Sequence, residues 1–595
     1  MKFPYGNADF HQIITENYVY IDRTDRIPLV EEFGKTLLFL RPRRFGKSLW
    51  LSTLWNYYDV NRADEFEQLF GHLAIGQNPT AKHNQYLILK WNFSTVETQG
   101  DIKEIRQMLH DHINASLKSF FVRYQSLLPF DIEFNPHNAL NSLELALTAV
   151  QATPYKVYLL IDEYDNFANE VLMARRRGNE NRYDDLIKGE GMLKTLFKVV
   201  KDGTEGQGID RVFITGVSPV VMSDVTSGFN VADNIYLRPE FNDLCGFTEA
   251  EISPILQQLV AQCGFPPEKA TELLNLIRTF YDGYCFSPRS QEFIYNPTLV
   301  LYFLKHLRQD CIPPERLLDQ NLAMDRGKIA YIAQLPRGEE LVWDTLNEKK
   351  QIALEGLAYR FGVEDILASQ KDNQFLISLL YYFGVLTLTT ERTGHGEPTF
   401  QIPNMVIRGL YAERIREMVL PTGPDLDAGK RVAQLLYQKG QIEPLCDFIE
   451  QRQFKVFDNR DYREADELVV KAVFLALLFN DIMYIMDSEP VLGRRYGDLL
   501  MLVRPDKRQY ILLDVLIEFK YVPLNKVKLT GEQVRGKNRV ELQALSAVQT
   551  AFTKAEEQLT SYRQILTKKY GDLLDLRTFT VVAVGYDRLV WRSYE

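Results

Sequence analysis

The stretch LLFLRPRRFGKSLW, residues 37–50, contains most of a phosphate-binding loop. Such a loop reads Gly, four residues, Gly-Lys-Ser/Thr, and it lies between a buried strand and a helix. Here residues 46–48 are Gly-Lys-Ser, but Arg41 occupies the position of the first glycine. The apolar run 37–40 predicts a buried parallel strand, and the large apolar residues of 48–58 have helical spacing. The sequence therefore predicts a strand, a loop and a helix around a nucleotide site.

The missing glycine does not by itself remove the site, because the amides that hold phosphate belong mainly to the later residues of the loop. We expect Lys47 to contact the β and γ phosphates and the Ser48 hydroxyl to bind Mg²⁺. The arginines Arg41, Arg43 and Arg44 either add positive charge near the phosphates or form a solvated rim. The loop residues predicted to contact the nucleotide are Arg43, Arg44, Phe45, Gly46, Lys47, Ser48 and Leu49.

The stretch KVYLLIDEYDN, residues 156–166, supplies the acidic motif that such a site also needs. Residues 157–161 predict a buried strand, and Asp162 and Glu163 follow at its carboxyl end. We expect Asp162 to bind Mg²⁺ through water and Glu163 to polarise the attacking water. The alternative is that the two acids cap a helix after a core strand.

A third predicted strand, RVFITGV at residues 211–217, also ends in polar residues. Thr215 lies near its carboxyl end, and Ser218 follows the strand. A hydroxyl in this position is suited to contact the γ-phosphate, so Thr215 is included among the predicted nucleotide-binding residues. The alternative is an ordinary strand residue.

The composition, 46% hydrophobic and 25% charged residues, is that of a folded chain of several domains. Its beginning, MKFPYGNADFHQ, lacks the apolar core of a signal peptide, and the longest apolar run, 375–388, is too short to span a bilayer. We therefore expect a cytoplasmic protein with no membrane partner. We expect free buried thiols, because no two neighbouring cysteines form a CxxC pair or a zinc knuckle; they are Cys245, Cys263, Cys285, Cys311 and Cys446.

The region after the third strand reads as helical. Thr248 and Glu251 have the spacing of a capping box that opens a helix over ISPILQQLVAQCG, and ATELLNLIRTFYDGY continues with helical spacing. This predicts a helical lid behind the nucleotide-binding core. Further on, LISLLYYFG is followed by two extended segments around a turn that contains His395, which predicts a winged-helix-like module. The wing has few basic residues, so it either spaces two domains or contacts DNA.

Two strand-like runs near the end of the chain, residues 496–505 and 510–522, place carboxylates beside a lysine. The first contains Asp498, and the second contains Glu518 and Lys520, which point to one face because they are two apart on a strand. Asp498 and Glu518 would hold Mg²⁺ or Mn²⁺ beside a scissile phosphate, and Lys520 would either orient the attacking water or stabilise the developing charge.

Two alternatives to this metal site remain open. Asp514 on the second run is a rival metal ligand. In the other alternative, all of these residues are salt-bridged strand residues with no metal.

The positive charge of the chain, whose net charge is -10, is densest next to this motif: residues 520–539 carry six basic residues and the single acid Glu532. This segment predicts phosphate contacts, and a solvated loop is the alternative.

Several motifs in the same order resemble a bacterial AAA-ATPase-like family that carries a C-terminal nuclease of the PD-(D/E)xK type. The resemblance covers most of the chain, and an arginine in place of the first glycine is usual in that family. The motifs are YVYIDRTDRIPLVEE, RPRRFGKS, LLIDEYDN, ITGVSPV, LCGFTEAEI, FYDGYCFS and IYNP.

The resemblance implies three further nuclease residues. An acid on the helix before the strands matches Glu467, chosen over Glu464, and a Gln-x-x-x-Tyr pair matches Gln558 and Tyr562, which lie one helical turn apart. Gln558 is taken as catalytic together with Glu163, Asp498, Glu518 and Lys520.

The predicted fold class is α/β. It comprises a P-loop NTPase core of the AAA+ type at 1–240, a helical lid at 241–315, a winged-helix-like region at 316–430 and a restriction-endonuclease-like α/β domain at 431–595. The predicted function is ATP hydrolysis, with Mg²⁺, coupled to metal-dependent cleavage of nucleic acid, with DNA favoured, in defence, repair or mobile-element biology.

Two alternatives come from other classes of protein. One is a nucleotide-switched signalling or nucleic-acid-binding protein whose nuclease-like domain is not catalytic, and the other is a remodeller of proteins. Whether the chain forms a homo-oligomer is left open.

Overall fold

The structure is a computed structural model whose contacts group the chain into two units, each described here by itself. The described residues are 1–96, 102–166, 192–219, 232–318, 326–335, 337–347, 352–358, 361, 372–420, 422–452, 454, 467–486 and 498–594. Unit 1 contains residues 1–262, 282–309 and 353–400, and unit 2 contains residues 263–281, 310–352 and 401–595. The finer four-part division of the chain stays a prediction.

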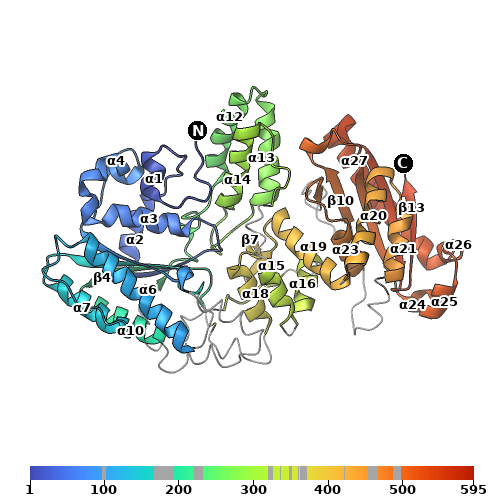
Figure 1. The fold of residues 1–595 in the computed structure, drawn as a ribbon. Helices are drawn as coiled ribbons and strands as arrows, with labels where there is room; N and C mark the ends of the chain where they lie inside the picture. The colour runs from blue at the N-terminus through green and yellow to red at the C-terminus, as the bar shows by residue number, and fades with distance from the viewer. Residues whose placement is uncertain are drawn as a thin grey trace. The chain divides into compact units, whose positions relative to one another are not determined.

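Unit 1 is built on a five-stranded parallel sheet of order β2-β3-β4-β1-β5 (Figure 1). The strands predicted at 37–40, 157–161 and 211–217 are confirmed, with ends that differ by one or two residues. Because β4 lies between β1 and β3, the loop after β1 and the acids after β3 face each other across one strand. The strands are β1 (Thr36–Leu40), β2 (Tyr86–Asn92), β3 (Lys156–Asp162), β4 (Ile209–Gly216) and β5 (Asp233–Asn234).

Helices cover both faces of this sheet, and Figure 1 shows α1 to α3 on one side and α7 and α10 on the other. The strands can be apolar along their length because both faces are covered, and every residue of β1 is buried. The helices are α1 (Phe10–Thr15), α2 (Ile27–Phe33), α3 (Lys47–Tyr58), α4 (Phe66–Phe70), α5 (Ala74–Gln77), α6 (Ile102–Arg123), α7 (Ala139–Gln151) and α10 (Met192–Thr204).

Later parts of the chain complete unit 1. A helix followed by a two-stranded hairpin is present where these were predicted, and His395 lies exposed in its turn. The identification of this region as a winged-helix-like module stays a prediction. The elements are α12 (Glu249–Gln262), α14 (Pro297–Asp310), α18 (Asn373–Tyr382) and a sheet of order β6-β8-β7, with β6 (Ile352–Ala353), β7 (Thr387–Arg392) and β8 (Pro398–Gln401).

Unit 2 contains a five-stranded mixed sheet of order β13-β12-β11-β10-β9. The chain passes through one helix, three antiparallel strands, a long helix, a strand parallel to β11 and a final antiparallel strand. The elements are α23 (Glu467–Leu478), β9 (Tyr484–Met486), β10 (Asp498–Val503), β11 (Asp514–Val522), α27 (Ser546–Tyr570), β12 (Leu576–Val584) and β13 (Arg588–Tyr594).

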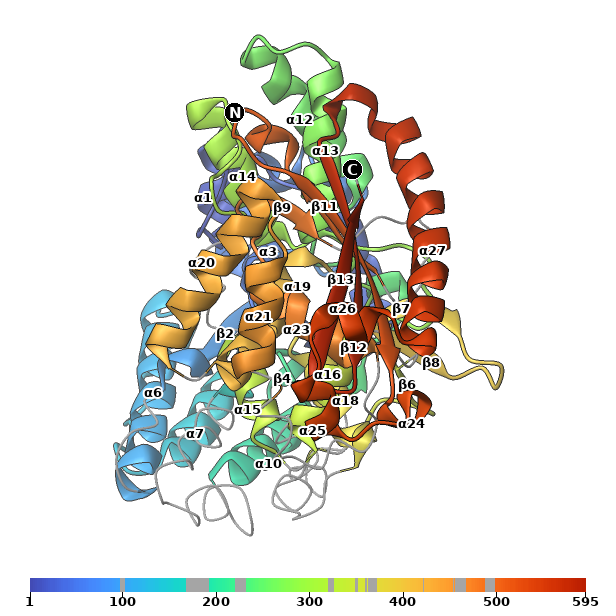
Figure 2. The same ribbon diagram turned by 90° about the vertical axis from the view of Figure 1, so that its right-hand side faces the viewer.

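The two helices α23 and α27 pack on opposite faces of this sheet, with the strands between them in Figure 2. Leu516 packs against Leu559 and Leu566 of α27, whereas Phe519, on the other face of β11, lies 4.9 Å from the ring centre of Phe474 on α23. The other helices of unit 2 are α13 (Glu268–Tyr281), α15 (Arg326–Ala333), α16 (Gly338–Asn347), α19 (Met405–Val419), α20 (Gly423–Lys439), α21 (Glu443–Arg452), α24 (Leu524–Val527), α25 (Gly531–Gly536) and α26 (Arg539–Gln543).

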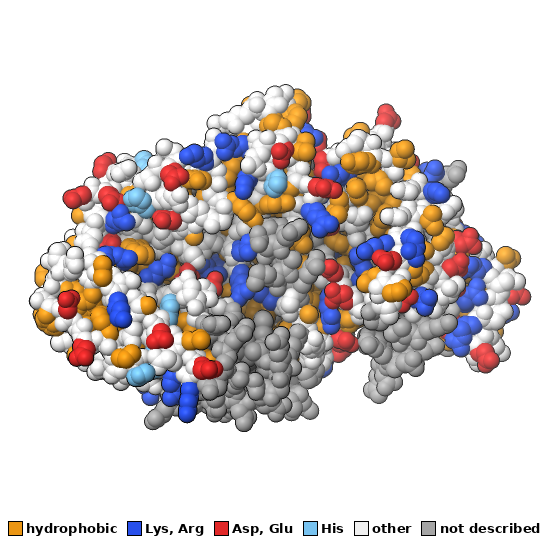
Figure 3. All heavy atoms as spheres, viewed as in Figure 1, with side chains coloured by type: hydrophobic (Ala, Val, Ile, Leu, Met, Phe, Trp, Pro, Cys, Tyr) orange, Lys and Arg blue, Asp and Glu red, His pale blue; other side chains and the backbone are white. Residues whose placement is uncertain are grey.

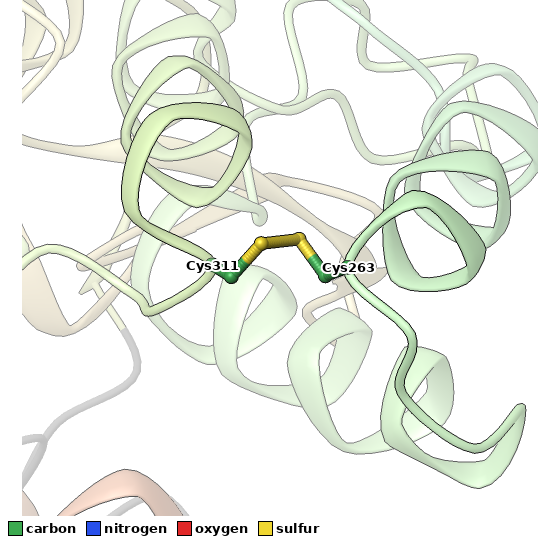
Figure 4. The surroundings of a disulfide bond; sticks show 2 residues. All are labelled: Cys263 and Cys311. Atoms are coloured by element: carbon green, nitrogen blue, oxygen red, sulfur yellow. A yellow bond between two sulfur atoms is a disulfide. The ribbon is translucent and has the colours of Figure 1, made fainter.

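The cysteine prediction is partly wrong. Cys263, just after α12, forms a disulfide with Cys311, just after α14 (Figure 4). Spacing in sequence could not find this pair, because the two helix ends meet only in the fold. The other three cysteines are free and buried, as expected. Within the described residues, no helix is both long enough and apolar enough to cross a bilayer.

Candidate functional site

The loop between β1 and α3 has the backbone of a phosphate loop. It is left-handed at Arg44 (φ 65°) and at Gly46 (φ 98°), and Gly46 is the N-cap of α3. The φ angle of Arg41 is not positive, so this position does not need the conformational freedom of a glycine. The first turn of α3 therefore presents its amides to an anion without the first glycine of the motif.

Arg41 is buried and turned into the protein. Its guanidinium donates hydrogen bonds of 2.6 to 2.9 Å to the carbonyl oxygens of Leu40, Tyr236 and Phe241, and it lies 4.1 Å from the ring centre of Phe286. Burial lowers the pKa of Arg41 to about 10. The prediction of a solvated rim is wrong for Arg41, and its donors are directed to backbone carbonyls rather than to phosphates.

Segments far along the chain brace this loop. The Phe45 ring is buried, with its centre 4.8 Å from that of Tyr284 and 5.2 Å from that of Phe286. The hydroxyl of Thr298, at the start of α14, donates to the carbonyl of Arg44 at 2.7 Å. The FYDGYCFS motif therefore supplies the two rings that pack against Phe45. The IYNP motif comes directly before Thr298, which holds the loop by its hydrogen bond.

The turn after α18 also packs on the loop. Gly384 has a left-handed backbone (φ 76°), and a Cβ atom at this position would lie 2.6 Å from Pro42 Cγ. Glycine is required there by both the conformation and the close approach.

Lys47 is buried beneath the loop. Its ammonium donates to the carbonyl oxygens of Arg41 and Pro42 at 2.8 and 2.9 Å, and within the described residues it makes no ion pair. Burial lowers the pKa of Lys47, although the nearby charges of Asp162 and Glu163 oppose that shift. The lysine is thus held by neutral groups in a place where an anion would provide its counter-charge.

Ser48, Asp162 and Thr215 form one hydrogen-bonded cluster. The hydroxyls of Ser48 and Thr215 donate to the two carboxylate oxygens of Asp162, each at 2.7 Å. These side chains come from α3, β3 and β4, and the sheet order brings them together. Hydroxyl and carboxylate oxygens are the ligands that Mg²⁺ prefers, so the residues present fit the predicted ion.

Glu163 follows Asp162 in a left-handed conformation (φ 50°), which is uncommon for a residue with a Cβ and concentrates at functional sites. The side chain is half-buried, and burial raises the pKa of its carboxyl, with the charge of Lys47 acting in the opposite direction. Arg43, from the loop, donates to the Asn166 side-chain oxygen at 2.5 Å. The loop and the acidic motif are thus joined by a side-chain contact.

Asp165 is a residue of the acidic motif to which the sequence analysis gave no role. Its carboxylate accepts hydrogen bonds from the amides of Val217 and Ser218 at 3.0 and 2.8 Å, and also one from the Ser218 hydroxyl. The neighbouring Tyr164 donates to the Ser218 carbonyl at 2.6 Å. The third acid of DEYDN was the signal available in the sequence. Asp165 holds the chain just after β4, two residues beyond Thr215.

In unit 2, Glu518 and Lys520 lie on one face of β11 as predicted. Glu518 is fully buried, and its Oε1 accepts from Lys520 Nζ at 2.5 Å. Its Oε2 is buried and accepts no hydrogen bond from the described residues. Asp498 lies directly opposite Glu518 in the register of β10 and β11, but its side chain is outside the described residues. Glu518 Oε2 is thus buried without a hydrogen-bond donor among the described residues, and β11 pairs at this position with the strand that carries Asp498.

Glu467, the first residue of α23, also contacts this lysine, because Lys520 Nζ donates to its Oε1 at 3.2 Å. Burial raises the pKa of the Glu467 carboxyl, and Lys520 opposes that shift. Gln558 is half-buried on α27, where Tyr562 packs in the cluster that contains Leu516, on the same face as Glu518. Glu464 is outside the described residues.

Asp514 is not a rival metal ligand. One of its carboxylate oxygens accepts from the Val503 amide at 2.8 Å, and the other accepts from Arg508 at 2.6 Å and from the Asp575 amide at 3.0 Å. The carboxylate of Asp514 is fully used in holding β10, β11 and β12 together. Among the side chains that the structure describes, no group of three His, Cys, Asp or Glu residues could hold a metal ion.

The basic segment after Lys520 is partly neutralised within unit 2. Arg535 pairs with Asp587, and Arg539 pairs with Asp447 and Glu450. Lys and Arg side chains are interspersed with Asp and Glu on the face drawn in Figure 3. Arg535 and Arg539 therefore have structural partners, which the count of basic residues along the sequence could not reveal.

Part of the chain that contains this sheet and loop is similar to a known protein family. Residues 4–226 match a family model described as predicted AAA-ATPase. That part of the chain is therefore similar to the AAA-ATPase-like family, and it contains strands β1 to β4 of the parallel α/β sheet and the phosphate-type loop described above. A protein of Azotobacter chroococcum mcd 1, described as an uncharacterized protein in the vnfD 5' region, is 27% identical over 450 residues, which is 75% of this chain and 74% of that protein.

Two solved structures from Aeropyrum pernix show a weak likeness. The ORC1 protein in complex with DNA is 10% identical, with a TM-score of 0.25, over 68% of this chain and 96% of that chain. The ORC2 protein, solved with ADPNP and ADP, is 14% identical, with a TM-score of 0.27, over 67% of this chain and 97% of that chain. These TM-scores are too low to support a shared overall architecture.

Proposed function

We propose that unit 1 binds ATP together with Mg²⁺ and hydrolyses it. The observation that carries this proposal is the cluster of Ser48, Asp162 and Thr215. In addition, the hydrogen bonds that the ammonium of Lys47 makes to the described residues go to neutral carbonyls, and it would gain a counter-charge from the β and γ phosphates. The exposed amides at the start of α3 would hold the same phosphates.

The roles of the side chains follow from their positions. Glu163 orients the attacking water and accepts its proton, which requires the ionised carboxylate. Thr215 donates to the γ-phosphate, and Ser48 and Asp162 supply the oxygen ligands of Mg²⁺. The ion, when bound, neutralises charge that develops on the phosphate oxygens. Phe45 and Leu49 shape the loop and the first turn of α3 around the nucleotide.

The proposal extends to unit 2, where nucleotide turnover is coupled to metal-dependent cleavage of nucleic acid, with DNA favoured. It is supported by the order of helix, three strands, helix and strand, and by the meeting of Glu518, Lys520 and Glu467 beside Asp498. Glu518 Oε2 is buried and lacks a donor, which would suit a bound cation in place of a hydrogen bond. Asp498 and Glu518 would hold Mg²⁺ or Mn²⁺, with Gln558 near the scissile phosphate.

The test separates the two activities. ATP hydrolysis and cleavage of single-stranded DNA, double-stranded DNA and RNA are measured with Mg²⁺ or Mn²⁺, each with and without ATP. We expect Glu163→Gln to bind ATP without turning it over, and Asp498→Ala to abolish cleavage while sparing ATP turnover. Unchanged ATP turnover in Glu163→Gln would refute the assignment of the ATPase site.

A second candidate function is a nucleotide-switched binding protein with a non-catalytic unit 2. The observation in its favour is that Lys520 is held between Glu518 and Glu467, as in a structural ion pair. The same assay decides between the two, since this candidate predicts ATP turnover with no cleavage of any nucleic acid.

A further inference from the structure

Unit 1 contains a groove of about 390 Å³ on the outer side of its edge strand β2. Its walls come from β2, the second half of α3 and the exposed side of α6, which lies beside β2 in Figure 2. The polar and aromatic side chains that matter for its chemistry are Trp55, Lys90, Asn92, Ser116, Ser119 and Arg123. The Trp55 end of the groove lies away from the nucleotide loop, because Trp55 follows Lys47 by eight residues on α3, about 12 Å along the helix axis. Asn92, which also lines the groove, lies beside Asp162 in the sheet.

Arg123 is held in a fixed orientation within this groove. Its guanidinium lies 4.1 Å from the ring centre of Trp55, and the indole nitrogen of Trp55 donates to Asp59 Oδ2 at 2.9 Å. Stacking on an aromatic ring leaves the edge of a guanidinium free to donate hydrogen bonds. Within the described residues these donors have no acceptor, so Arg123 is positioned but not neutralised.

Lys90 adds a second positive charge to the same groove. It projects from β2, with its ammonium 5.9 Å from the Trp55 ring centre, and it makes no ion pair with the part of the chain that the structure describes. Asp59, the acid that fixes Trp55, is buried, and its other oxygen accepts from Tyr124 at 2.9 Å and from the Asn61 amide at 3.0 Å. Two cations therefore share one groove that no acidic side chain lines.

The rest of the lining combines apolar side chains of β2 and α6 with His112 and with neutral donors. Ser116 and Ser119 lie one turn apart on α6, and Asn92 ends β2. The Asn92 side-chain oxygen accepts from Ser94, which leaves its amide nitrogen as a donor. An arginine fork, an ammonium, two hydroxyls and an amide suit an oxyanion with several acceptor oxygens.

We propose that this groove binds a phosphate group, carried either by a small phosphorylated molecule or by the backbone of a nucleic acid. A phosphate offers more acceptor oxygens than a carboxylate, and the donors here come from three elements on different sides. The ligand would contact two elements that also reach the nucleotide site. These are α3, which begins at Lys47, and β2, whose Asn92 is in register with Asp162. The inference uses no residue of unit 2 and does not depend on the nuclease proposal.

The test is a binding titration in the Lys47→Ala background, so that the loop after β1 contributes little. Pyrophosphate and a short oligo-dT are titrated separately, with Trp fluorescence and calorimetry as readouts. Lys90→Gln combined with Arg123→Gln should weaken binding at least about tenfold, or about 1.4 kcal/mol, since two charged donors to the phosphate are lost. Binding of pyrophosphate alone would identify a small phosphorylated ligand, and tighter, salt-dependent binding of the oligonucleotide would identify nucleic acid.

Lys35→Gln combined with Lys118→Gln is the matched control, because it removes the same charge from unit 1 outside the groove and should bind as the background does. Lys90→Gln alone preserves the stack of Arg123 on Trp55, and thermal melting checks that each variant folds. Absence of binding to both probes at millimolar concentration would overturn the proposal. Equal binding by the groove variant and the control would also overturn it.

Discussion

Two lysines, Lys47 in unit 1 and Lys520 in unit 2, occupy the predicted sites in opposite electrostatic settings. Lys47 donates to two backbone carbonyls and has no ion pair within the described residues. Lys520 lies between the carboxylates of Glu518 and Glu467. Within the described residues, Lys47 has no carboxylate hydrogen-bonded to it and is placed to meet an anion, whereas Lys520 is bound by two carboxylates, which suit a cation. The same residue type thus marks two different chemistries, and its immediate partners distinguish them.

The strongest test of this contrast removes the carboxylate of unit 2. Glu518→Ala should lower nucleic-acid cleavage at least about 1,000-fold, or about 4 kcal/mol, because a metal ligand is lost. The measurement is the cleavage rate at saturating Mn²⁺, with the exposed acid Glu532→Ala as a control. Cleavage retained in Glu518→Ala would show that this cluster is not a catalytic centre.

The corresponding test in unit 1 removes the lysine. Lys47→Ala should weaken ATP binding about 100-fold, because charged hydrogen bonds to the phosphates are lost. Calorimetric titration with ATP and Mg²⁺ measures the change, and the exposed Lys35→Ala should bind as the wild type does. A similar loss for AMP, which has neither a β- nor a γ-phosphate, would contradict this contact.

Lys520 should differ from Lys47 in its effect on stability. Lys520→Met leaves Glu518 buried without its counter-charge, so the free energy of unfolding should fall by about 3 kcal/mol. Thermal melting measures this, and added Mn²⁺ should raise the melting temperature more in the variant than in the wild type. If the pair is only a structural salt bridge, Mn²⁺ will have no effect on either protein.

The smallest effect is expected at Asp165, which acts through the end of β4. Asp165→Asn weakens the hydrogen bonds to the amides of Val217 and Ser218, and ATP turnover should fall about tenfold while ATP affinity stays within about threefold. The exposed Asp202→Asn is the control. Equal losses in turnover and affinity would indicate a general disturbance of unit 1 rather than misplacement of Thr215.

Much of unit 1 could be predicted because its sites follow short local patterns. The apolar runs before Lys47 and Asp162 fixed the strands, and parallel strands bring their carboxyl ends to one edge of a sheet. The role of Arg41 could not be predicted, since its hydrogen bonds reach carbonyls about 200 residues away. The role of Asp165 was missed for the same reason, because its partners Val217 and Ser218 follow the end of another strand, β4.

In unit 2, alternation along a strand correctly placed Glu518 and Lys520 on one face. The sequence could not show that Asp514 is saturated by backbone amides and Arg508, or that Arg535 and Arg539 are paired with acids. Both depend on contacts between elements distant in sequence. The Cys263–Cys311 bridge was unpredictable for a similar reason, because two helix ends must first be brought together.

The packing of the loop after β1 has a consequence for where this chain can be divided. The Phe45 ring packs against the rings of Tyr284 and Phe286. The Thr298 hydroxyl donates a hydrogen bond to the Arg44 carbonyl, and Gly384 packs closely against Pro42. The region that matches the family model ends at residue 226, so a fragment cut at that boundary would expose an aromatic side chain and lose the supports of its own nucleotide loop. The smallest fragment able to bind ATP should therefore extend to about residue 400, well beyond the segment that matches the family model.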